Sequence, residues 1–138
     1  MLTKMTNTKR FFADTNVLVY LISDDASKAR TAAEILKAAP FISVQVLNEF
    51  VSVARRKHKK SWDDIHDVLD FVKTECPLVA LTVETHERAI GLAESSLLDI
   101  YDACIVAAAE IAGCGVLYTE DLSHGQRIGG VTIHNPFA

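Results

Sequence analysis

Four acidic residues lie where the surrounding sequence is apolar and a carboxylate has little structural reason to be. One follows a short apolar run in FFADTNVLVYL, and another follows the run VLYT. The other two interrupt the apolar faces of expected helices, in QVLNEFVSV and in YDACIVAAAEIAG. In chain order the four are Asp14, Glu49, Asp102 and Asp121.

Carboxylates that gather within a few ångströms repel one another, and some stay protonated unless a cation offsets the repulsion. A hard divalent cation such as Mg²⁺ or Mn²⁺ does so, because it prefers oxygen ligands and keeps water molecules for chemistry. Such a site activates water and stabilises charge on a phosphoryl oxygen. If the four carboxylates converge, a phosphodiester is their natural substrate.

The elements that must position these acids alternate along the chain. Short apolar runs predict strands over residues 11–13, 41–44, 77–81, 115–118 and 131–133. Helical periodicity and capping residues predict helices over residues 17–22, 27–39, 45–57, 61–74, 85–95 and 101–112. This alternation predicts an α/β fold, with a mostly parallel sheet between layers of helices. Because ligands bind beyond the carboxyl ends of parallel strands, the four acids could converge on one crevice there.

The totals describe an ordinary domain. With 138 residues, 49% of them hydrophobic, the chain suits a single domain spanning residues 1–138. No apolar run approaches the roughly 20 residues of a membrane helix, and MLTKMTNTKR lacks the apolar stretch of a secretory signal. We therefore expect a soluble, cytosolic protein without a membrane partner. Cys76, Cys104 and Cys114 match neither a zinc site nor a redox pair and are expected to be reduced thiols.

The charge balance argues at first against nucleic acid. The net charge is −4, whereas nucleic-acid binding usually calls for a basic surface. However, 18 acidic residues minus the four above leaves 14, which equals the 14 Lys and Arg residues. An acidic chain of this composition therefore does not exclude a nucleic-acid substrate.

The segments that carry these acids resemble those of PIN-domain proteins, and most closely those of the VapC-type ribonuclease toxins of bacterial toxin–antitoxin pairs. The resemblance runs in the family's order through FFADTNVLVYL, FISVQVLNEF, IYDACIVAAAEIAGCGVLYTEDLSHGQ and VTIHNPF. It implies a PIN-like three-layer α/β/α sandwich with a central, mostly parallel sheet of four or five strands. It also implies metal-dependent RNA hydrolysis, leaving 5′-phosphate and 3′-hydroxyl ends, a VapB-type antitoxin partner and a homodimer.

The resemblance also implies a role for each acid. Asp14 and Asp102 would contact one or two Mg²⁺ or Mn²⁺ ions directly. Glu49 and Asp121 would complete the ligand set, directly or through water. Asn16 and Thr119 match positions at which the family often keeps a hydrogen-bonding side chain, so they are supporting candidates.

One departure from the family is Asp99, where a small polar residue is more usual. A fifth acid could extend the metal site or have no catalytic part. Each acid also has a structural alternative: Asp99 and Asp102 could cap their helix, and Asp14 could be a turn-forming or N-capping residue before Val17. Glu49 has less reason to be structural, because a charged side chain on an apolar helical face needs a partner.

Two further features are ambiguous in the sequence. The run RRKHKK, residues 55–60, could bind a phosphate backbone, although a solvated helix end whose cations complement the dipole is the favoured interpretation. His124 follows Asp121 in a polar loop, where surface placement is favoured over a substrate contact.

Two other functions compete with a ribonuclease. One is a receiver-like signalling domain that accepts a phosphoryl group with Mg²⁺. Receivers need a late lysine, and no lysine follows Lys73. The other is a PIN-like binding module for RNA or protein without catalysis, but such modules typically lose one or more of the acids, and all four are present here.

Overall fold

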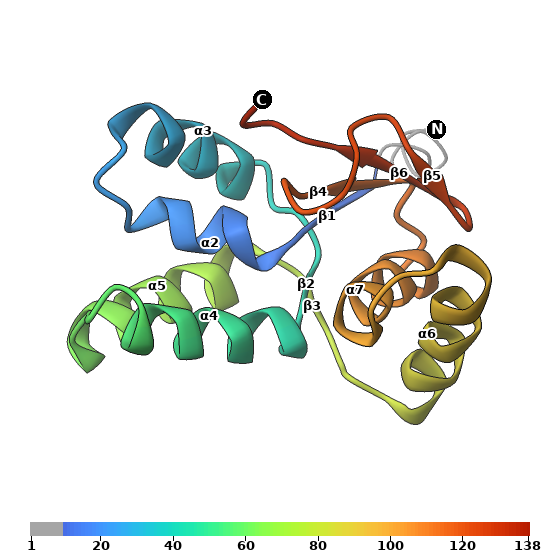
Figure 1. Ribbon diagram of the computed structural model, residues 1–138. Helices are drawn as coiled ribbons and strands as arrows, with labels where there is room; N and C mark the ends of the chain where they lie inside the picture. The colour runs from blue at the N-terminus through green and yellow to red at the C-terminus, as the bar shows by residue number, and fades with distance from the viewer. Residues whose placement is uncertain (1–9) are drawn as a thin grey trace, which may run out of the picture.

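The computed structural model of the chain describes residues 10–138 (Figure 1). These residues form six helices and six short strands: a pair of helices follows each of the first three strands, and the last three strands are consecutive. The strands are β1 (Phe11–Ala13), β2 (Ile42–Ser43), β3 (Leu78–Val79), β4 (Val116–Tyr118), β5 (Arg127–Ile128) and β6 (Val131–His134). The helices are α2 (Thr15–Leu21), α3 (Ala26–Lys37), α4 (Val44–Arg56), α5 (Trp62–Glu75), α6 (Val83–Ser96) and α7 (Ile100–Ile111).

The central sheet has four strands in the order β1-β4-β6-β5. β1, β4 and β6 are parallel neighbours, and only β5 runs antiparallel. β2 and β3 form a second, parallel pair. A parallel bridge between Phe12 and Phe41 joins this pair to β1, with the Phe41 N–H donating to the Phe11 carbonyl at 2.9 Å. The predicted α/β class and the mostly parallel four- or five-stranded sheet are confirmed.

Helices flank the strands in two groups (Figure 1). Helices α2 to α5 lie on one side and α6 with α7 on the other. The strands contribute fully buried side chains to the core between them, among them Phe12, Leu117 and Ile133. Helix α7 is rich in alanine and buries Ala103 and Ala107 completely, so its backbone lies close to its neighbours. No helix within residues 10–138 has both the length and the apolar character to cross a membrane.

Three predicted boundaries are wrong in an informative way. The first helix begins at Thr15 rather than Val17, because Asp14 itself is the N-cap. Val44 belongs to α4 and not to the preceding strand, because the Ser43 side chain accepts the Val46 N–H and caps the helix. Residues 123–130, expected to be a loop, contain β5, which pairs with β6 across Gly129 and Gly130. A Gly-Gly pair before an apolar run is a hairpin signal that would have revealed it.

The three cysteines are free thiols, as predicted. Cys76 and Cys114 are buried, and burial raises the pKa of each to about 11.

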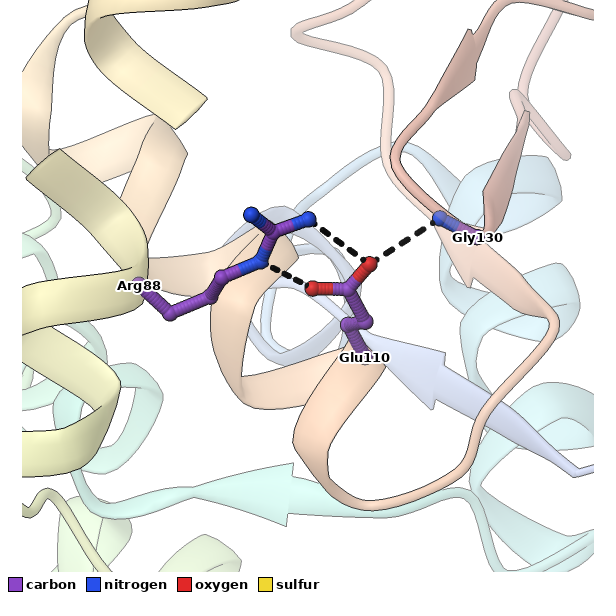
Figure 2. A network of polar contacts seen from close by, with 3 residues as sticks. All are labelled: Arg88, Glu110 and Gly130. Carbon is purple, nitrogen blue, oxygen red and sulfur yellow. Dashed lines mark hydrogen bonds and ion pairs between the residues drawn. The ribbon is translucent and has the colours of Figure 1, made fainter. Parts of the chain in front are cut away.

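A bidentate ion pair fastens α6 and α7 to the β5–β6 turn (Figure 2). The Arg88 guanidinium donates to both oxygens of Glu110, with 3.1 Å between Nη2 and Oε2. The Gly130 N–H donates to the same Glu110 Oε2 at 3.1 Å. A β-carbon on Gly129 would lie 2.6 Å from Glu110 Oε2, so glycine leaves room for this carboxylate. Arg88 is the main reason that the pKa of Glu110 is lowered.

Candidate active site

Asp14 is a buried carboxylate at the end of β1, with 5% of its surface exposed. One oxygen accepts the Thr15 N–H at 2.6 Å, and the other accepts the Thr119 hydroxyl at 2.9 Å. Burial raises the pKa of Asp14 to about 7, and these two hydrogen bonds only partly oppose the rise. Asp14 therefore is the N-cap that the structural alternative predicted, but capping alone leaves its negative charge without a compensating partner.

Thr119 organises the polar groups at the end of β4. Its hydroxyl donates to Asp14, and it accepts the Asn16 amide at 3.2 Å and the Asp121 N–H at 3.0 Å. One donated and two accepted bonds use the full capacity of a hydroxyl. Thr119 is completely buried, so these bonds hold Asp14, Asn16 and Asp121 in fixed relative positions.

Asn16 connects Thr119 to Asp121. Both of its amide hydrogens are used, one for Thr119 and one for Asp121 Oδ2 at 3.2 Å. Its carbonyl oxygen Oδ1 is buried and has no hydrogen-bond partner in the part of the chain that the structure describes. A buried oxygen without a partner is costly, which favours a water molecule or cation beside it.

Glu49 projects from the second turn of α4 and is held by two neutral donors. The Thr15 hydroxyl donates to Oε1 at 2.8 Å, and the Gln45 amide donates to Oε2 at 2.9 Å. The same Gln45 amide nitrogen also reaches the Tyr101 carbonyl at 3.1 Å, which ties α4 to the start of α7. Thr15 and Gln45 are not among the site residues predicted from the sequence. Gln45 could have been found from its place one helical turn before Glu49.

At the start of α7 the two neighbouring acids divide their tasks. Asp99 is the N-cap, and its side chain accepts the Asp102 N–H at 2.9 Å. The Asp102 carboxylate makes no hydrogen bond within residues 10–138. Its pKa rises to about 6, because of burial first and then the charges of Asp99, Asp121 and Glu49. Capping therefore explains Asp99 and does not explain the carboxylate of Asp102.

The charges of Glu49 and Asp121 act on both Asp14 and Asp102. Burial is the main cause that raises the pKa of Asp121, and the charge of Glu49 adds to it. Asp121 and Glu49 in turn add to the raised pKa of both Asp14 and Asp102. The one ion pair among residues 10–138 is Arg88 with Glu110, at a distance from these acids, so no lysine or arginine neutralises them by contact. The ends of β1 and β4, the second turn of α4 and the first turn of α7 thus place Asp14, Asp121, Glu49 and Asp102 in one region, linked through the charges of Glu49 and Asp121.

An open pocket of about 500 Å³ lies beside this cluster. It is walled by α2 and α4 and by the segment that follows β4. Its lining includes the acids Glu49, Glu120 and Asp121 together with Lys57 and His58. His124 does not line this pocket. It is exposed, and its Nδ1 accepts the Asn135 N–H at 3.0 Å.

The family profile of the PIN domain matches residues 11–126. The chain belongs to the PIN-domain family. The resemblance expected from the sequence is thereby confirmed, and a receiver-like phosphoacceptor domain is excluded. Among curated protein sequences, none matches this PIN domain.

Solved structures of toxins share the fold of this PIN domain. A toxin–antitoxin complex from Klebsiella pneumoniae is 23% identical with a TM-score of 0.69, and the match covers 94% of this chain and 98% of that one. DNA-bound VapBC from Salmonella typhimurium is 19% identical with a TM-score of 0.69, covering 94% and 99%. VapC20 from Mycobacterium tuberculosis, a toxin that cleaves the sarcin–ricin loop, is 18% identical with a TM-score of 0.65, covering 80% and 89%.

The donor chemistry of this PIN domain fits a hard divalent cation. The clustered groups offer only oxygen ligands, and the free Asn16 Oδ1 adds a neutral one. Within the described residues no three acidic, histidine or cysteine side chains already lie close enough together to hold an ion. Mg²⁺ keeps several water molecules and is bound directly by only one or two carboxylates, so it does not require three of them in contact.

Proposed function

We propose that this PIN domain is a Mg²⁺- or Mn²⁺-dependent endoribonuclease that hydrolyses phosphodiester bonds of RNA. One observation carries the proposal. Among residues 10–138 no lysine or arginine pairs with Asp14, Glu49, Asp102 or Asp121, and the pKa of Asp14 and of Asp102 rises to about 7 and about 6. Groups with such shifts mark functional sites more often than structural ones.

The family resemblance implies how the residues share the work. Asp14 and Asp102 would hold one or two ions directly, and Glu49 and Asp121 would complete the ligand set directly or through water. When bound, the ion supplies an activated water and stabilises charge on a phosphoryl oxygen. Thr119 fixes the orientation of Asp14 through its hydroxyl.

The remaining residues keep the carboxylates in place. Asn16 holds Asp121 through its amide, and Thr15 with Gln45 holds Glu49. In the reaction, the oxygen of water bonds to phosphorus and the bond from phosphorus to the 3′-oxygen breaks. The 3′-oxygen takes up the proton that water gives up. The products carry a 5′-phosphate and a 3′-hydroxyl.

We further propose that residues 1–138 act as one nuclease domain and as the toxin of a VapBC-type pair. Support comes from the structural neighbours, which are named as toxin–antitoxin complexes and cover 94% of this chain. The partners would be a VapB-type antitoxin, a second copy of the chain and an RNA substrate in the cytoplasm.

The test compares two charge-neutral variants on the same helix. Asp102→Asn removes an unpartnered carboxylate at the start of α7, whereas Glu110→Gln removes a partnered one near its end. The purified proteins are incubated with total bacterial RNA and Mg²⁺, and the new RNA ends are mapped. We expect Asp102→Asn to lower the cleavage rate by about 10³-fold, in the range seen when one group that stabilises the transition state is lost.

Glu110→Gln is expected to cleave at the rate of the unmodified chain. Equal rates for the unmodified chain and Asp102→Asn would contradict the proposal, as would cleavage that persists in EDTA. Absence of any cleavage together with no measurable Mg²⁺ binding would instead favour a non-catalytic PIN-like binding module, which the spacing of the acids in the described residues leaves open.

A further inference from the structure

One face of α4 connects two parts of the pocket that carry opposite charge. Glu49, Val53 and Lys57 all line the pocket and are four residues apart, so they follow one another along a single face of the helix and its C-cap. Eight residues of helix span about 12 Å. Glu49, a member of the acidic cluster, and Lys57 are therefore separated by about two helical turns along the helix axis.

The basic run at residues 55–60 is not uniform in the structure. The Arg55 guanidinium donates to the Lys60 carbonyl at 3.0 Å and lies 4.8 Å from the centre of the Trp62 ring. The Arg56 Nε donates to the Ser52 hydroxyl at 3.0 Å. Both arginines thus stabilise the end of α4 and the turn into α5.

Lys57 and His58 differ from the rest of the run. They are the two members that line the pocket, and both are exposed. Neither forms an ion pair within residues 10–138, where Arg88 and Glu110 make the one such pair. A helix end that only complements the dipole would not require its cations to face the same pocket as the acids.

The charge pattern of the pocket suits a polyanion that passes both parts. At one part the carboxylates require a cation before any phosphate can approach. At the other part a lysine and an imidazole N–H donor are free to meet a phosphate directly. A nucleic-acid strand, with phosphates at regular intervals, can place one phosphate at each part of the pocket, whereas a small anion can occupy only one part.

We propose that Lys57, with His58 beside it, binds a backbone phosphate of the RNA strand at a distance from the phosphate that is hydrolysed. The inference rests on the proposed function for the identity of the strand. It adds a binding subsite to the acidic cluster. The RNA strand would then follow α4 from the C-terminal end of the helix to Glu49.

The test measures how salt weakens RNA binding, because each phosphate contact by a cation releases condensed counterions. The probe is a fluorescent, random-sequence single-stranded RNA of about 20 nucleotides at a fixed Mg²⁺ concentration, and every protein compared also carries Asp102→Asn, so that a cation is available to the acidic cluster while cleavage is slow. The logarithm of the binding constant is plotted against the logarithm of salt concentration. Losing one contact should lower the slope by about 0.7 for a single strand.

The matched control is Lys59, which has the same charge, is exposed, and does not line the pocket. We expect Lys57→Gln to lower the slope by about 0.7 and Lys59→Gln to leave it unchanged, with Lys57→Arg restoring it. In Mg²⁺, Lys57→Gln should raise KM several-fold without changing kcat. Thermal unfolding of each variant shows that the fold is kept.

Equal slopes for Lys57→Gln and the unmodified chain would overturn the subsite, and so would equal losses in both glutamine variants or no RNA binding at all. These outcomes are distinct from failure of the proposed function. A chain that binds RNA with the expected slopes but does not cleave it retains the subsite and loses the nuclease activity. A chain that cleaves with unchanged slopes loses only the subsite.

Discussion

Glu110 and Asp14 show two ways in which one fold accommodates a carboxylate. Glu110 receives an arginine and a backbone N–H, and its pKa is lowered. Asp14 is more deeply buried and receives only a hydroxyl and a backbone N–H, and its pKa rises to about 7. The chain supplies a cation where a carboxylate fastens elements together. Within residues 10–138 no lysine or arginine pairs with the acidic cluster, which is expected where a bound metal ion supplies the positive charge.

Asp14 and Glu110 differ most in how their charges make the free energy of unfolding depend on pH. The carboxyl of Asp14 has an ordinary pKa of 3.8 and a pKa of about 7 in the fold. The folded state therefore binds the proton more tightly, and stability falls as pH rises from about 4 through 7. The neutral amide of the variant Asp14→Asn imitates the protonated carboxyl. In EDTA at pH 8 this variant should therefore be more stable by up to about 4 kcal/mol, at roughly 1.4 kcal/mol for each pH unit.

Urea unfolding at several pH values measures this difference. It should become small near pH 3, where most of the Asp14 carboxyl is protonated in both the folded and the unfolded chain. A stability difference that is the same at pH 3 and at pH 8 would show that packing, and not the buried charge, distinguishes the two side chains.

Addition of Mg²⁺ should restore part of the stability that is lost when the buried Asp14 carboxyl is ionised. A ligand that binds only the folded state stabilises it by about 2.7 kcal/mol at one hundred times its Kd. We expect the Tm of the unmodified chain and of Glu110→Gln to rise with Mg²⁺ concentration and that of Asp14→Asn to stay constant. An equal rise in all three would place the ion elsewhere on the protein.

The smallest change in stability is expected at Glu110, the carboxylate that is paired with Arg88. Glu110→Gln removes the charge from an exposed ion pair but can keep a hydrogen bond to Gly130, so it should cost about 1 kcal/mol. Because the pKa of Glu110 is lowered from 4.5, its contribution is present above pH 4.5 and lost as pH falls through the folded pKa. Urea unfolding at pH 7 and near pH 4 checks this trend, which is opposite to that of Asp14. A variant as stable as the unmodified chain at pH 7 would mean that the ion pair adds nothing.

Much of the fold follows from local sequence patterns. The runs that became β1, β4 and β6 are short, apolar and bounded by turn residues, so each predicts a buried strand directly. The two residues of β5, one of them charged, carry no periodicity of their own, so the only sequence signal for this strand was the Gly-Gly pair before β6. It exists through pairing with β6, which is a tertiary property.

Part of the candidate site could also be predicted from the sequence, through the expected sheet topology. The parallel sheet brings the ends of β1 and β4 side by side, so proximity of Asp14 and Asp121 follows from topology. The hydrogen-bonding roles of Thr15 and Gln45 depend on side-chain directions that composition does not reveal. The separate tasks of Asp99 and Asp102 became clear only from the bond between the Asp99 side chain and the Asp102 N–H. The metal-binding roles of the four acids stay predictions.

The spacing of Glu49, Val53 and Lys57 along α4 has a consequence for how such a sequence can vary. Inserting or deleting one residue between Glu49 and Lys57 would rotate one of them by about 100° relative to the other. The helix could remain amphipathic and well packed after compensating substitutions, yet the two charges would no longer face the same hollow. For the two charges to face the same pocket, the number of residues between Glu49 and Lys57 therefore matters more than which residues they are.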